Sequence, residues 1–130
     1  MNNTLVPLLA RVLLSGLFLY AGYNKILNVA GTAGYFGKLA LPMPEILVWL
    51  VIAVELLGAV LVLIGWQTRL VAWVMAVFTV GTAIIGHKFW GIDPAQFNNQ
   101  FTQFLKNLGI AGGFLMLAAC GPGRLAVDRR

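Results

Sequence analysis

The stretch Ile46–Ile64, ILVWLVIAVELLGAVLVLI, decides the fold class because Glu55 is its one charged residue. A run of about 20 predominantly apolar residues is long enough to cross the hydrocarbon core of a bilayer as an α-helix. Strands of a membrane barrel would instead alternate apolar and polar residues over about 10 positions. The stretch therefore predicts a membrane-spanning helix with a carboxylate near its middle.

Three further apolar stretches lie on either side of this one. Because Asp93-Pro94 is typical of a helix N-cap followed by proline at the first helical position, the last stretch is expected to begin there, outside the membrane. We expect an all-α integral membrane bundle of four transmembrane helices, with residues 1–130 forming one domain. The expected spans are about residues 4–23, 45–64, 70–87 and 94–120.

The composition excludes several classes of protein. Of the 130 residues, 60% are hydrophobic and 10% are charged, whereas a soluble domain is about 25% charged. A water-soluble or disordered chain is therefore excluded. The formal charge is +5, but the basic residues are scattered singly, which excludes nucleic acid as a partner and favours the lipid bilayer. No basic residue precedes the first apolar stretch, so we expect that stretch to be retained and not cleaved as a signal peptide.

The connecting segments predict an orientation. The first loop, Gly31–Leu41, has the pattern of a short interfacial amphipathic helix that Pro42 and Pro44 would end. The side with both termini carries a small excess of basic residues, which predicts that both termini are cytoplasmic. The residues compared are Arg69, Arg124, Arg129 and Arg130 on that side, against Lys25, Lys38 and Lys88 on the other.

Ionisable side chains at membrane depth are costly and usually face the interior of a bundle, where they pair. Glu55 is expected near the midplane, with Arg11 approaching from one side and Lys106 from the other. We therefore predict that Glu55 pairs with Arg11 or with Lys106. Helical spacing places four sets of residues on inward faces: Arg11, Ser15, Phe18, Gly22 and Lys25; Glu55, Gly58 and Ala59; Thr79, Thr82 and Gly86; and Lys106, Gly109 and Gly113.

A buried carboxylate among cations can relay a proton or bind the polar head of an amphipathic molecule such as a quinone. Glu55, His87, Lys106 and Asn107 offer the donors and acceptors that a quinone head group needs. Simpler interpretations stay open: a buried ion pair that only fixes helix neighbours, a lone histidine at a helix end, and a lysine that extends to the interface. The sequence has no paired haem ligands, no nucleotide motif and no metal-ligand spacing, so the cofactor is left unknown, with a quinone as the candidate.

The order of short motifs resembles the DoxX family of small four-helix bacterial inner-membrane proteins. The resemblance covers nearly the whole chain, and one departure from it is Ala126, where many members have a serine before the hydrophobic-Asp pair. The motifs are AGYNK (21–25), LALP (39–42), VELLG (54–58), LIGWQTR (63–69), GHKFW (86–90), FLKNL (104–108), GGFL (112–115), GPG (121–123) and VDR (127–129).

The resemblance implies a multi-pass protein of the bacterial inner membrane and a link to quinone or quinol redox systems, or to resistance to quinones and oxidative stress. It also matches Arg11, Lys25, Glu55, His87, Lys106 and Asn107 to recurring positions. We therefore take Glu55 as the candidate catalytic residue and the other five as candidate ligand-binding residues. Whether the chain is an enzyme is left open, since no self-contained redox site is seen.

The main hypothesis is a membrane component of a quinone-linked redox or quinone-stress system, working with a redox partner protein. The alternatives are a non-catalytic scaffold or assembly subunit of a larger complex and, less favoured, a small transporter. A homo-oligomer is left open, and a transporter would require one because four short helices enclose little space.

Overall fold

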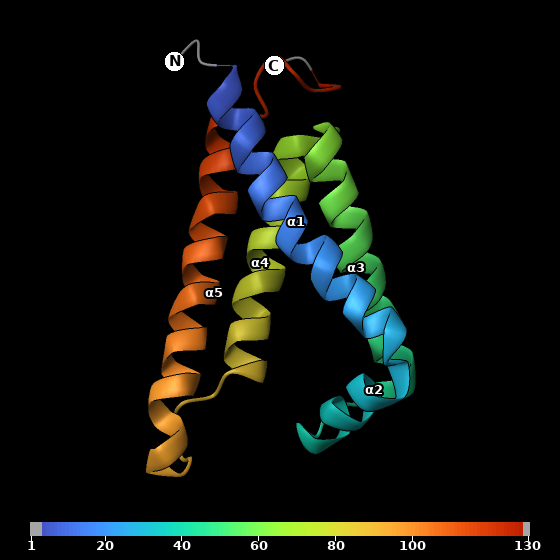
Figure 1. The fold of residues 1–130 in the computed structure, drawn as a ribbon, viewed down its shortest axis with the longest axis vertical. Coiled ribbons are helices and arrows are strands. Elements are labelled where there is room, and N and C mark those ends of the chain that lie inside the picture. The colour runs from blue at the N-terminus through green and yellow to red at the C-terminus, as the bar shows by residue number, and fades with distance from the viewer. Residues whose placement is uncertain (1–3, 129–130) are drawn as a thin grey trace.

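The computed structural model describes residues 4–128 and consists of α-helices joined by short connections (Figure 1). Four helices are long and apolar enough to cross a membrane, and α2 is a short extra helix. The predicted all-α bundle with a short helix in the first loop is therefore confirmed. The helices are α1 (Leu5–Leu27), α2 (Val29–Lys38), α3 (Pro44–Ile64), α4 (Thr68–Gly86) and α5 (Pro94–Cys120).

Local sequence chemistry sets the helix ends. Gly65 ends α3 in the left-handed conformation, with φ of 74°, which glycine adopts without steric cost. Pro44 and Pro94 stand in the first turns of α3 and α5, where a missing N–H breaks no helical hydrogen bond. The carboxylate of Asp93 accepts a hydrogen bond from Ala95 N at 3.2 Å, so the cap expected at the start of α5 is confirmed.

The helices pack as two pairs, α1 along α3 and α4 along α5 (Figure 1). The pairs are close at the end where the chain begins and ends, and they diverge toward the other end, across which α2 lies. Both ends of the described chain are therefore on one side of the bundle. Arg129 and Arg130, which enter the expected charge balance, lie outside the described residues.

Aromatic side chains of α1, α4 and α5 pack against one another between the two helix pairs. The ring centroid of Phe18 on α1 lies 5.6 Å from that of Phe114 on α5 and 6.4 Å from that of Phe78 on α4. A second, smaller cluster of Phe36, Val48 and Ile52 holds α2 against α3. Many large apolar side chains point outward instead, as expected of helices whose outer faces meet lipid.

The inward faces expected for α1 and α3 are confirmed, because Arg11, Ser15, Phe18 and Gly22 are buried, as are Glu55, Gly58 and Ala59. The face expected for α5 is wrong. Lys106 and Gly109 are exposed, although the third residue of that face, Gly113, is half-buried and lies close to Leu14. The buried face of α5 is instead formed by Ala111, Phe114, Leu117 and Ala118.

Helix geometry explains the error. At about 100° per residue, Lys106 lies about 140° around the helix from Ala111, whereas Asn107 lies only about 40° from it. The packing of α5 against α4 therefore turns Asn107 inward and Lys106 outward.

Candidate functional site

A cavity of about 510 Å³ lies at the wider end of the bundle, where the helix pairs diverge. Residues from α1, α2, α3, α4 and α5 line it, together with His87 just after α4. Most of the wall is leucine, isoleucine, valine, phenylalanine and small residues. The polar side chains in the wall are Lys25, Tyr35, Glu55, Thr79, Thr82, His87 and Asn107.

An ion pair between Lys25 and Glu55 forms part of the cavity wall. Lys25 Nζ lies 3.0 Å from Glu55 Oε1 and donates a hydrogen bond to Oε2 at 3.3 Å. Glu55 comes from the middle of α3 and is 5% exposed, while Lys25 comes from the last turn of α1. The crossing of α1 and α3 therefore brings the carboxylate and the ammonium group together.

The predicted pairing of Glu55 with Arg11 or Lys106 is wrong. Arg11 is fully buried at the closely packed end, where its guanidinium donates a hydrogen bond to Leu125 O in the chain after α5. Lys106 is exposed on the outer face of α5. Neither residue lines the cavity, and Lys25 supplies the cation for Glu55 because α1 continues one turn beyond the expected end at Tyr23.

On the opposite wall, His87 and Asn107 line the same cavity. His87 Nδ1 lies 3.2 Å from Gln100 Oε1, so α5 holds the ring of a residue that ends α4. Tyr35 from α2 donates a hydrogen bond to Gly86 O at 3.0 Å and so connects α2 to the end of α4. Of the six predicted site residues, the cavity thus brings together Lys25, Glu55, His87 and Asn107.

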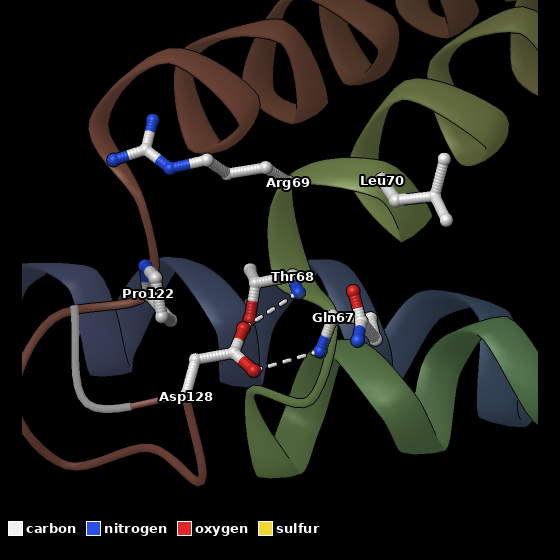
Figure 2. A pocket seen from close by; sticks show the side chains of 6 residues that line it. All are labelled: Gln67, Thr68, Arg69, Leu70, Pro122 and Asp128. Atoms are coloured by element: carbon white, nitrogen blue, oxygen red, sulfur yellow. Dashed lines mark hydrogen bonds between the residues drawn. The ribbon is translucent and has the colours of Figure 1, made fainter.

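The other end of the bundle has a smaller polar pocket of about 150 Å³, lined in part by Thr68, Arg69 and Asp128. Figure 2 shows the Asp128 carboxylate directed at the first turn of α4. It accepts hydrogen bonds from Gln67 N at 2.8 Å and from Thr68 N at 2.7 Å. Arg69 donates to Ala118 O at 2.9 Å and to Ala119 O at 2.6 Å. These contacts satisfy the free backbone groups at two helix ends, which indicates a structural role for this pocket.

Comparison with known protein families adds to this geometry. The DoxX family profile matches residues 6–88, which is more than half of the chain. The chain belongs to the DoxX family.

Named relatives of this DoxX protein match over nearly the whole chain. Inner membrane protein YqjF of Escherichia coli is 41% identical, and the match covers 94% of this chain and 88% of the relative. Inner membrane protein YphA of the same organism is 36% identical, with 95% and 88% covered. A Bacillus subtilis protein named "Putative oxidoreductase CatD" is 35% identical, with 93% and 83% covered. No solved structure matches the chain.

With four apolar helices and inner-membrane relatives, this DoxX protein is a multi-pass protein of the inner membrane that contacts the lipid bilayer. The side of the membrane on which its termini lie stays a prediction.

Sequence reasoning missed three residues that organise the DoxX helices: Tyr35, Gln100 and Asp128. Each acts on a residue distant in sequence, at separations of 51, 13 and 60 or 61 positions. Asp128 carried the clearest signal, because a lone acidic residue after the last span can cap a helix at the same end of the bundle. For Tyr35 and Gln100, the sequence gives no indication of these contacts beyond the presence of a polar side chain in an apolar chain.

The cavity of this DoxX protein combines an apolar wall with a few converging polar groups, which is typical of a small-molecule site. The carboxylate can accept a hydrogen bond from a hydroxyl of a ring, and the imidazole and carboxamide groups can accept from such a hydroxyl or donate to a ring oxygen. The neighbouring ammonium group compensates the charge of the carboxylate in a medium of low dielectric constant. The arrangement can therefore hold an amphipathic ring or exchange a proton with it.

Proposed function

We propose that this DoxX protein binds a small amphipathic ring of the quinone class in its cavity, as a membrane component of a quinone-linked redox or quinone-stress system. The single observation that carries the proposal is the Lys25–Glu55 ion pair in the wall of an otherwise apolar cavity. In this proposal, Glu55 holds or relays a proton, while Lys25, His87 and Asn107 contact the oxygen atoms of the head group.

The size and position of the cavity support this proposal. A volume of about 510 Å³ falls in the range of about 300–1,000 Å³ that is typical of small-molecule sites. The cavity lies between spanning helices, so an apolar molecule dissolved in the bilayer is its natural ligand.

The energetics of buried ion pairs also support a functional role for Glu55. Removing two charges from water is costly, and well-packed apolar residues of similar volume are often equally or more stabilising. Ionisable residues inside membrane proteins are for this reason functional candidates by default. The name of the relative CatD, which describes an oxidoreductase, is consistent with redox chemistry in the same family. We propose that a partner protein supplies or accepts the electrons.

Binding of ubiquinone-1 and its reduced form to the purified protein in detergent, measured by isothermal titration calorimetry, tests the proposal. We expect saturable binding by the wild-type protein and binding weakened at least about tenfold by Glu55→Gln or Lys25→Met, because each change removes one half of the ion pair. Lys106→Gln is the matched control, since it removes an exposed lysine of α5 outside the cavity, and it should bind like the wild type.

Absence of saturable binding in both redox forms, by wild-type protein that is helical and monodisperse, would contradict the proposal. The scaffold or assembly role would then be favoured, and it predicts that the protein co-purifies with a larger complex.

A further inference from the structure

The three hydroxyl groups in the cavity wall each donate a hydrogen bond to a backbone carbonyl. Tyr35 donates to Gly86 O at 3.0 Å, Thr79 to Met75 O at 2.6 Å, and Thr82 to Thr79 O at 2.9 Å. A hydroxyl has one proton to donate and two lone pairs that accept. These oxygen atoms can therefore offer a ligand acceptors only.

Glu55 adds a further acceptor. The hydrogen bond from Lys25 goes to Oε2, and the buried Oε1 has no hydrogen-bond partner, although Lys25 Nζ lies 3.0 Å away as its counter-ion. An ionised carboxylate accepts hydrogen bonds and donates none. Oε1 is therefore charge-compensated and still able to accept a hydrogen bond from a ligand.

His87 is held as an acceptor by Gln100. The amide oxygen of Gln100 can only accept, so the contact of 3.2 Å between Oε1 and His87 Nδ1 requires the proton of a neutral imidazole to be on Nδ1. The lone pair is then on Nε2, on the other side of a ring that lines the cavity. Gln100 itself does not line the cavity, so it acts on the ligand through His87.

We infer that the cavity selects the reduced, hydroxyl-bearing form of its ring ligand, a quinol, over the oxidised quinone, and that Gln100 is a positioning residue for this selection. The inference rests on the proposed function and deepens it. The two hydroxyls of a quinol donate to Glu55 Oε1 and His87 Nε2. The two carbonyls of a quinone would place lone pairs against those same atoms.

The remaining donors in the wall do not reverse this preference. The Lys25 ammonium and the Asn107 amide can donate to the oxygen of either form, because a hydroxyl and a carbonyl both accept. Only the acceptors distinguish the two forms. A site built to accept from a ligand hydroxyl discriminates strongly against an analogue that lacks it, since its polar groups are left unpaired.

Anaerobic calorimetric titration with decylubiquinol and decylubiquinone tests the inference. We expect the dissociation constant of the quinol to be at least about tenfold lower, which is the scale of one buried acceptor left unpaired. Gln100→Leu should reduce the preference for the quinol, because His87 can then turn or change tautomer, while Glu55 Oε1 still accepts from the quinol. Gln100→Glu keeps an acceptor for Nδ1–H and should retain the preference. Gln103→Leu, on the same helix and outside the cavity, is the matched control and should also retain it.

The possible failures are distinguishable. If both forms bind with equal affinity, or the quinone binds more tightly, the selection for quinol is wrong while the proposed binding function stands. If Gln100→Leu and Gln103→Leu change the ratio equally, Gln100 has no positioning role. If neither form binds to folded protein, both the inference and the proposed function are wrong.

Discussion

At the residue scale, the two partners of the Lys25–Glu55 pair are not equivalent. The Lys25 side chain is 25% exposed and the Glu55 side chain is 7% exposed. Lysine can extend its amine toward the interface when its partner is lost, but Glu55 in the middle of α3 has no such route. Loss of the cation should therefore destabilise the protein more than loss of the carboxylate.

A double-mutant cycle measures this asymmetry. We expect Lys25→Met to lower the free energy of unfolding by about 3 kcal/mol, because it leaves a buried charge uncompensated, and Glu55→Gln to lower it by less. The double variant should lose less than the sum of the two single changes. Equilibrium unfolding in mixed detergent and SDS micelles gives these values, and additive losses would show that the two side chains do not interact.

The sequence pattern did not predict that Lys25 is the cation that pairs with Glu55. Depth along a straight helix placed Arg11 and Lys106 on either side of Glu55, and the inward stripe of α1 was correctly predicted. The choice of Lys25 depends on the crossing of α1 over α3 and on the continuation of α1 past Tyr23, and hydropathy specifies neither. Asn107 and Lys106 are adjacent, so a rotation of α5 by one residue decides which of them reaches the cavity.

At the element scale, the start of α4 depends on the chain that follows α5. Gln67, at the N-cap position of α4, makes no side-chain cap, and Asp128 supplies the acceptors instead. We expect Asp128→Ala to lower the free energy of unfolding by about 1 kcal/mol, through loss of the cap and of a negative charge at a helix N-terminus. Arg124→Ala, an exposed change in the same segment, is the control. Equal unfolding curves for the two variants would contradict the capping role.

The turn between α3 and α4 depends on Gly65. Its φ of 74° disfavours any residue with a side chain, and a Cβ there would meet Arg11 Nη1 and Ala126. Gly65→Ala should therefore destabilise the protein by about 1–2 kcal/mol. Gly16→Ala is the matched control, because Gly16 lies in α1 with open space around its Cα, and alanine is the better helix former there. Thermal melting in detergent should move down for the first variant and stay level or rise for the second.

At the scale of the whole molecule, the two ends of the bundle differ: hydrogen bonds between several segments hold the closely packed end together, and fewer contacts hold the wider end. At the closely packed end, Arg11 and Asp128 connect the segment after α5 to α1 and to the start of α4, and Arg69 connects α4 to the last turn of α5. At the other end, α2 is held to α3 by an apolar cluster and to α4 by the hydrogen bond of Tyr35. A sequence pattern could indicate α2 but not this difference between the two ends.

The basic residues predict the side of the membrane on which the wider end of the bundle lies. Arg69 and Arg124 belong to the side of the closely packed end, and Lys25, Lys38 and Lys88 belong to the side of the wider end. The excess of basic residues on the first side therefore depends on Arg129 and Arg130. We predict cytoplasmic termini, so that the cavity opens near the periplasmic surface.

A green fluorescent protein fused after residue 130 should fluoresce, and alkaline phosphatase inserted within residues 88–93 should be active, because these reporters work on opposite sides of the inner membrane. Replacing Arg124, Arg129 and Arg130 together with glutamine should weaken this orientation. The reverse pattern of reporter activities would place the cavity at the cytoplasmic surface and overturn the predicted topology.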